Sequence, residues 1–358
     1  MKKAIILLLV AVFAASMLFI GIGCKTGETT ETTVAETTVA ETSAEETTAV
    51  EETTAEEKIK MALGTVSWKT DGSWGQSMEE ASVFIQENYP NVEVNFTDAI
   101  SFGDINKYLE LQCQNGVQLI FLDSNATWFT ALEEIAPKYP DTWFVTGGGS
   151  LEDNQKLADN VTVYMVSQEE GEFLAGIATA MMTESKKIGF VSAFDYPAIV
   201  ANMKAWEQGA LYVDPAIELS YAWTGVWGDA EKHYETVKAV LDQGVDVLNH
   251  DLDSLGFLKA AQEKSAWIIG AHRDQSDLDP TLFLTSALIL HNDMAELSLQ
   301  KFMDGTISKE GAKFGLKDGY DTLAPLTNVP DEVVTKVEEA KEKIISGEIT
   351  VELVFALE

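Results

Sequence analysis

Polar side chains gather behind two short apolar runs in the second half of the chain, at residues 245–248 and 267–270. The side chains that follow these runs are those of Asn249, His250, Asp251, Asp253, Arg273 and Asp274. Short apolar runs bounded by turn residues fit buried parallel strands, and ligands of open α/β sheets bind beyond the carboxyl ends of such strands. No nucleophile stands beside a base here, so the pattern indicates binding of a small molecule rather than catalysis.

Each of these groups also has a structural interpretation. The Asp253 carboxylate can accept hydrogen bonds from a ring N–H or an exocyclic amine, and it can equally cap a helix at residues 254–264. Asp274 is a candidate contact to a base or a ribose, or a salt-bridge partner of Arg273. A hydrolytic set of His250, Asp253 and Ser254 would lie on one turn without a nucleophile elbow, which argues against an enzyme.

Two tryptophans have the surroundings of ligand contacts. Trp74 stands in the polar, glycine-flanked segment 71–75 after the first apolar run, and Trp227 follows another strand-like run and precedes Asp229, a candidate helix cap. An aromatic ring in such a place can stack on a flat heterocycle, and the alternative is packing against a neighbouring loop. One ring from each half of the molecule would sandwich a base, whereas Trp223, inside its strand, is expected in the core.

The elements that must position these side chains alternate between strand and helix patterns. The expected strands are 59–66, 92–96, 119–122, 142–145 and 161–165, then 187–191, 217–223, 245–248, 267–270 and 282–288, with a last strand at 350–355. The expected helices are 76–87, 102–114, 128–139, 170–183, 197–210, 229–243, 254–264 and 329–345. This alternation predicts an α/β protein with parallel sheets and helices on both faces, and the number of strands predicts two lobes.

Composition excludes several classes of function. The 358 residues carry a net charge of −34, which argues against a nucleic-acid partner, although part of the surplus lies before residue 58. Cys113 is the one cysteine after Cys24 and reads as a buried core residue, and the four histidines show no paired metal spacing. The glycines at 147–149 lack the features of a phosphate loop. We therefore expect neither a metal nor another cofactor.

The N-terminal segment has the features of export. Two lysines precede an apolar run at residues 4–20, and Gly21-Ile22-Gly23-Cys24 resembles a bacterial lipobox in which Gly21 replaces the usual leucine. This predicts a signal peptide at 1–23, lipidation of Cys24, and a disordered Thr- and Glu-rich tether over 24–57. The body would hang from the extracytoplasmic face of the cell membrane. An uncleaved anchor and an ordinary signal peptide are the alternatives.

Residues 164–193, with Glu170-Gly171 before a small-residue helix and then Lys187-Ile-Gly-Phe-Val, resemble the basic membrane protein family of substrate-binding lipoproteins. Matching pieces are Trp227-Gly-Asp, the stretch 244–286 and F-G-L-K-D-G-Y at 314–320, so the resemblance covers nearly all of 59–358. It implies a type I periplasmic-binding-protein fold with the ligand in the interlobe cleft. Lobe 1 would comprise 59–165 and about 284–312, and lobe 2 would comprise 166–283 and about 313–358. It also implies a purine ligand, an ABC transporter permease as partner, and a monomer.

The resemblance also implies which residues contact the ligand: Trp74, Ser167, Gln168, Glu169, Trp227, His250, Asp253 and Asp274. The order of Trp227, His250 and Asp253 is closer to the adenine-binding branch than to the nucleoside branch. This chain has Asp-Gly-Ser-Trp-Gly at 71–75 where nucleoside members have Asp-Lys-Ser-Phe-Asn, and it has Ser-Gln-Glu at 167–169 where the adenine branch has aromatics and an arginine. A protein of the same fold that binds a sugar or another small polar solute is the alternative. A repressor of this fold would need a DNA-binding helix pair at its N-terminus, where this chain has the expected signal peptide and acidic tether, so the sequence argues against a repressor.

Overall fold

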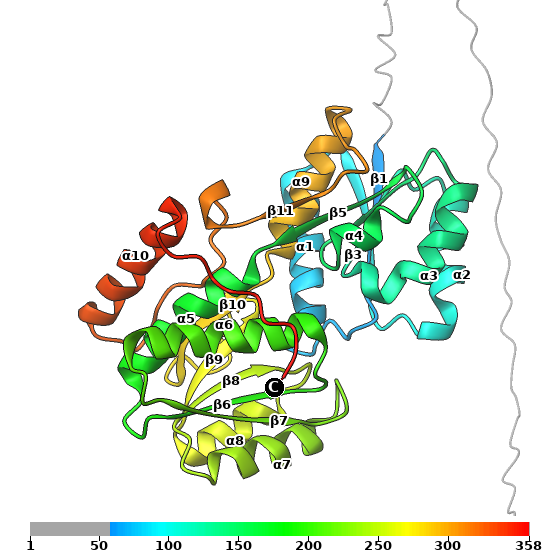
Figure 1. The fold of residues 1–358 in the computed structure, drawn as a ribbon. Helices are drawn as coiled ribbons and strands as arrows, with labels where there is room; N and C mark the ends of the chain where they lie inside the picture. Colours follow the sequence, from blue (N-terminus) through cyan, green and yellow to red (C-terminus); the bar gives the residue numbers. More distant parts are fainter. Residues whose placement is uncertain (1–57, 358) are drawn as a thin grey trace, which may run out of the picture. The chain divides into compact units, whose positions relative to one another are not determined.

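The computed structural model describes residues 58–357, and these form two parallel sheets (Figure 1). The predicted signal peptide, lipidation site and tether lie outside the described residues. The first sheet has the strand order β11-β5-β4-β3-β1-β2, and the second has the order β10-β9-β8-β6-β7. The strands of the first sheet are β1 (Ile59–Gly64), β2 (Val92–Thr97), β3 (Leu119–Leu122), β4 (Trp143–Thr146), β5 (Val161–Val166) and β11 (Ala312–Phe314). Those of the second are β6 (Lys187–Ser192), β7 (Glu218–Trp223), β8 (Val247–Asp251), β9 (Trp267–His272) and β10 (Phe283–Leu288).

Helices cover both faces of each sheet, as the sequence predicts. Because successive side chains of a strand point to opposite faces, β1 sends Met61 and Leu63 into one apolar cluster and Ala62 into another. The first cluster lies under α1 (Trp74–Asn88) and α9 (His291–Met303), which lie together in Figure 1. The other cluster lies under α2 (Ile105–Gln114) and α3 (Asn125–Ile135). Short helices complete this part: η1 (Phe102–Asp104), η2 (Ala136–Lys138) and α4 (Leu151–Asn154).

The second sheet is covered in the same way. One face packs against α5 (Gln168–Met182) and α6 (Pro197–Val213), and the other packs against α7 (Ala230–Leu241) and α8 (Gly256–Lys264). The segment η3 (Leu316–Asp318) leads to α10 (Asp331–Ser346), which packs on α5. The α/β class with two lobes of parallel sheet is therefore confirmed.

The chain passes between the sheets three times, after β5, after β10 and after β11. Because β10 pairs with β9, residues 284–288 belong to the second sheet and not to the first, where the sequence analysis placed them. The last crossing follows Phe314, since β11 still pairs with β5.

The strand predicted at 350–355 is wrong, because the structure has no strand there. The backbone N–H and C=O of Glu352 bond instead to the side chain of Gln208 on α6. A side-chain amide thus satisfies the backbone groups that a neighbouring strand would otherwise satisfy.

Helices α5 and α6 meet backbone to backbone at two glycines. A Cβ atom on Gly209 would lie 1.9 Å from the carbonyl oxygen of Phe173, and one on Gly176 would lie 2.1 Å from that of Trp206. Gly209→Ala should therefore push the helices apart and lower the free energy of unfolding by about 1–3 kcal/mol, as overpacking does. Thermal denaturation measures this, with Gly103→Ala as the control, because a Cβ atom there meets nothing within 4 Å. Equal melting temperatures for both variants would contradict the prediction.

Candidate functional site

Both sheets reverse their strand order at one point, and open α/β sheets bind ligands at such points. The reversal lies between β1 and β3 in the first sheet and between β6 and β8 in the second. The loop at residues 65–73 and Asp123 follow the first pair of strands, and Phe194, Tyr196 and Asp253 follow the second. These are the residues from which we build the site.

The two edges contact each other through the loop after β1. Ser73 Oγ lies 2.8 Å from His272 Nδ1, and Ser67 Oγ donates to Asp253 Oδ2 at 3.5 Å. Asp71 shapes this loop, because its carboxylate accepts from the backbone N–H groups of Ser73 and Gly75 at 2.7 and 2.8 Å. The lobes are therefore in contact through this loop.

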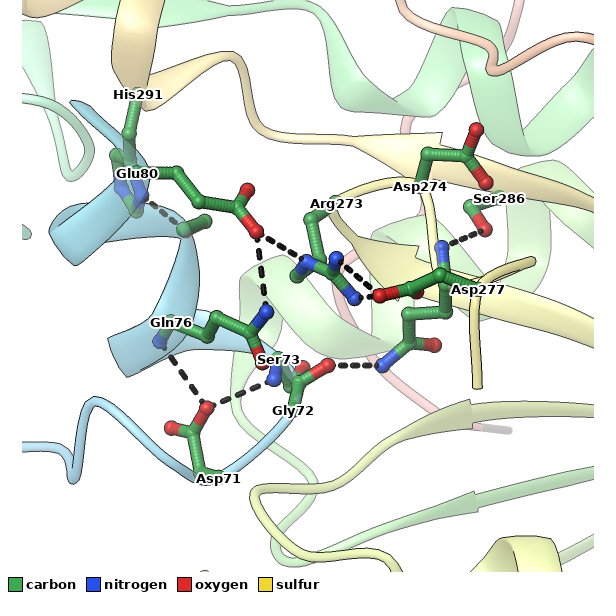
Figure 2. Close-up of polar contacts among 12 residues, drawn as sticks. Asp71, Gly72, Ser73, Gln76, Glu80, Arg273, Asp274, Asp277, Ser286 and His291 are labelled. Atoms are coloured by element: carbon green, nitrogen blue, oxygen red, sulfur yellow. Dashed lines mark hydrogen bonds and ion pairs between the residues drawn. The ribbon is translucent and has the colours of Figure 1, made fainter. Parts of the chain in front are cut away.

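The polar contacts beside this point form what we call the interlobe seam, which consists of Gly72, Ser73, Glu80, His272, Arg273 and Gln275. Figure 2 labels Gly72, Ser73, Glu80 and Arg273 among them. Gln275 Nε2 donates to Gly72 O at 2.8 Å, while its Oε1 accepts from the Ala271 backbone N–H at 2.9 Å and lies 3.0 Å from His250 Nε2. Arg273 contacts Glu80 of the first lobe at 2.8 Å and Asp277 of the second at 3.0 Å. One fully buried amide and one guanidinium thus join the lobes.

Gln275→Ala should weaken the interlobe seam and leave the carbonyl of Gly72 without its donor. We expect the free energy of unfolding to fall by about 1–3 kcal/mol and the ligand-free protein to populate a more open form. Calorimetry and small-angle scattering measure the two effects. The neighbouring Ser276→Ala is the control, and a radius of gyration equal in both variants would show that Gln275 does not hold the lobes together.

Trp74 is the first residue of α1 and not part of a polar loop as predicted. Its indole Nε1–H donates to Asp123 Oδ2 at 3.1 Å. The ring meets the imidazoles of His272 and His291 nearly at right angles, with centroids 4.8 and 4.9 Å away. The indole is thus held by residues from three separate segments.

Trp227 belongs to a group of three aromatic rings in the second lobe. Its ring centroid lies 5.6 Å from that of Phe194 and 6.1 Å from that of Tyr196, and the last two rings are stacked at 5.4 Å. The carbonyl oxygen of Trp227 accepts from the backbone N–H of Asp253 at 3.1 Å, so the main chains of these two residues lie side by side. No ring contact joins Trp74 to Trp227 within residues 58–357.

Two carboxylates at the facing edges differ in their partners. Asp123 is buried and accepts from Trp128 Nε1 and Thr65 Oγ1, both at 2.7 Å, as well as from Trp74. Asp253 Oδ1 is shielded from solvent and has no hydrogen-bond partner. Burial and the nearby carboxylates of Asp71 and Asp251 raise the pKa of Asp253 well above its usual range. An unpartnered, buried carboxylate oxygen can accept from a ligand N–H.

The remaining predicted contacts have partners elsewhere. His250 lies on strand β8, is stacked on Phe257 at 3.6 Å, and has a pKa lowered to about 3 by burial. Asp274 is exposed and accepts from the backbone N–H of Ser276. Asp274 also lines a cavity of about 490 Å³ together with Ser77 and Glu80 of the first lobe. A role of His250 or Asp274 in ligand binding stays a prediction.

Ser167, Gln168 and Glu169 lie where the chain crosses into the second sheet. The Ser167 N–H donates to Phe314 O at 2.7 Å, Gln168 accepts from Asn202, and Glu169 pairs with Lys313 at 2.6 Å. These contacts join two crossing segments, and a role in ligand binding stays a prediction.

The hydrolytic set weighed above is not assembled, because Ser254 Oγ bonds to His233 Nδ1 at 2.6 Å and not to His250. Within the part of the chain that the structure describes, no group of three or more His, Cys, Asp or Glu residues could hold a metal ion. No helix over residues 58–357 is long and apolar enough to cross a membrane.

Several site residues escaped the sequence analysis: Asp123, Phe194, Tyr196 and Gln275. Asp123, Phe194 and Tyr196 carried a usable signal, because they follow the apolar runs 119–122 and 187–191 as Asp253 follows its own run. Gln275 carried none, because its role depends on a carbonyl more than two hundred positions earlier in the chain.

Residues 58–353 match the Bmp family model, described as "ABC transporter substrate-binding protein PnrA-like". The chain belongs to this family of extracytoplasmic solute-binding components of transporters, which is not a family of enzymes. A purine-binding protein of Brucella abortus is 27% identical over 82% of this chain and 83% of its own length. A Haloferax volcanii protein, provisionally named as an ABC transporter glucose-binding protein, is 27% identical over 82% and 74%.

Among solved structures, an ABC transporter solute-binding protein of Aeropyrum pernix has a TM-score of 0.72 at 22% identity, covering 83% of this chain and 94% of its own. This likeness confirms the type I fold.

Proposed function

We propose that this protein captures a purine, either an adenine-like base or a nucleoside, and delivers it to the permease of an ABC transporter. Two observations carry the proposal: Asp253 Oδ1 has no partner, and the backbone of Asp253 bonds to Trp227, whose ring contacts those of Phe194 and Tyr196. A ring stacks on a flat heterocycle, and a carboxylate oxygen accepts from a ring N–H or an exocyclic amine. A purine has both features.

The name of the Brucella abortus relative supports a purine, and the name of the Haloferax volcanii relative supports a sugar as the second candidate. A sugar ring would also lie on an aromatic ring, but its hydroxyl groups need several polar partners. The charged side chains of the proposed site are the carboxylates of Asp123 and Asp253, and Arg273 is already paired with Glu80 and Asp277. We therefore expect a neutral ligand rather than a phosphate ester.

A thermal-shift screen of the purified protein with adenine, hypoxanthine, adenosine and glucose tests the proposal. A ligand that binds only the folded state adds about 2.7 kcal/mol at a hundredfold excess over its Kd. Trp227→Ala should weaken purine binding roughly 5- to 150-fold, since stacking contributes about 1–3 kcal/mol per base. Trp223→Ala, on strand β7, is the control. Stabilisation by glucose and by none of the purines would favour the sugar.

We propose that the two sheets form two lobes that close on the ligand, with the three crossing segments as the hinge. The protein would act as a monomer tethered by a lipid on Cys24, with the segment before residue 58 as the tether. Metabolic labelling with palmitate should mark the protein and should fail to mark Cys24→Ala. An unlabelled wild-type protein would contradict the lipid anchor and would not bear on the proposed ligand.

A further inference from the structure

Two carboxylates follow strands at the switch points of opposite lobes, and the structure satisfies only one of them. Asp123 follows β3 in the first lobe, and Asp253 follows β8 in the second. Both Asp123 oxygens accept hydrogen bonds at 2.7 to 3.1 Å from within the protein. Asp253 has one partner at 3.5 Å and one oxygen with none. The two lobes therefore offer a ligand different numbers of acceptors.

The donors to Asp123 come from two sides. Trp128 is fully buried in the core under α2 and α3, and its indole N–H donates to Asp123 Oδ1. Trp74 is only partly buried, begins α1, and its indole donates to Oδ2, as does the hydroxyl group of Thr65. Trp74 therefore occupies the less buried side of the carboxylate.

We propose that the Trp74 indole N–H occupies the Asp123 carboxylate, so that the ligand does not bond to it. Asp253 is then the carboxylate that accepts a hydrogen bond from the polar edge of the ligand. Trp74 is then a specificity-determining residue through its N–H as well as through its ring. The inference rests on the proposed purine function and deepens it. The site accepts a purine with a donor toward the second lobe and gains nothing from a further amine directed at the first.

Trp74→Phe separates the two roles of this side chain, because it keeps an aromatic ring and removes the N–H. It leaves Asp123 Oδ2 with Thr65 as its remaining donor, and a buried carboxylate oxygen that has lost one of two donors favours a ligand that brings another. A purine with an added amine group is such a ligand. The variant should therefore acquire a preference that the wild-type protein lacks.

Calorimetric titration with two matched pairs of bases tests the inference: 2,6-diaminopurine against adenine, and guanine against hypoxanthine. Each pair differs only by an amine at C2. In Trp74→Phe, the affinity ratio within at least one pair should rise about tenfold or more over the wild-type ratio, as expected for one hydrogen bond to a charged group. In Trp74→Phe/Asp123→Asn this gain should disappear.

Trp128→Phe is the matched control. It removes the other indole N–H from the same carboxylate, but the oxygen that it frees faces the core. It should lower the melting temperature and leave both ratios within twofold of the wild-type ratios. Ratios that stay unchanged in a folded, purine-binding Trp74→Phe protein would overturn the inference alone. A wild-type protein that binds no purine would contradict the proposed function and therefore also the inference that rests on it.

A second measurement uses the wild-type protein alone, so it does not depend on the folding of a variant. In ¹⁵N-tryptophan-labelled wild-type protein, the Trp74 indole N–H should stay protected from solvent exchange when the protein is saturated with adenine. Loss of that protection on binding would mean that the ligand displaces the indole from Asp123, and would overturn the inference.

Discussion

Replacing Asp253 by asparagine is expected to stabilise the ligand-free protein and to weaken purine binding at the same time. The stabilisation follows because burial and neighbouring carboxylates raise the pKa of Asp253, so its ionised form opposes folding at neutral pH. Asparagine has a similar shape and no charge. The melting temperature should rise by a few degrees, and it should rise more at pH 8 than at pH 5, because the penalty grows as the carboxyl group ionises.

The loss of affinity follows because the amide cannot replace a charged acceptor at Oδ1. A hydrogen bond to a charged group contributes about 1.5–3 kcal/mol, which corresponds to a roughly 10- to 150-fold weaker Kd. Differential scanning calorimetry and titration with adenine measure the two effects on one protein sample. Asp274→Asn, an exposed residue whose carboxylate accepts from the Ser276 N–H, is the control. A variant that loses stability and keeps its affinity would show that Asp253 is structural.

Stability should also depend on pH through Glu172 on α5. This side chain is 3% exposed, accepts from Asn249 Nδ2 at 2.7 Å, and has a pKa raised to about 8 by burial and by the nearby Asp251. A carboxyl group with a raised pKa binds its proton more tightly in the folded state. Its contribution is therefore complete below the unfolded pKa, near 4.5, and is lost as the pH rises through about 8.

Between pH 5 and pH 8 this group should remove roughly 3 kcal/mol from the free energy of unfolding. Glu172→Gln keeps an acceptor for Asn249, so most of that loss should vanish in this variant. Urea denaturation at a series of pH values measures the slope. The exposed Glu235→Gln should retain the wild-type slope. Parallel slopes for wild type and Glu172→Gln would exclude Glu172 as the source.

The sequence predicted most strands because their side chains are apolar on both faces, as in β3, whose four residues are all fully buried. It ended β8 three residues early, since Asn249 and His250 look like loop residues. Both are buried on the strand, where Asn249 Nδ2 donates to Glu172 and His250 Nε2 lies 3.0 Å from Gln275 Oε1. A polar residue can continue a buried strand when a distant partner bonds to it, and one sequence does not identify that partner.

The same limit applied to the site. Asp253 and Trp227 were predicted from local signals, a polar residue after an apolar run and an aromatic before a helix cap. The pairing of Trp74 with Asp123, and that of Gln275 with Gly72, depend on how separate segments meet in space. Asp274 was predicted from the resemblance, but its local turn with Ser276 decides where its carboxylate lies.

The threading of the chain through both sheets has a consequence for biogenesis. Strand β5 ends at Val166, but β11, which covers its outer edge, begins only at Ala312. A nascent chain therefore completes most of one sheet, then the whole of the other, before that edge is paired. Unpaired strand edges are templates for association between chains, and non-local pairings form slowly. During the interval between β5 and β11, the outer edge of β5 is therefore open to pairing with another chain.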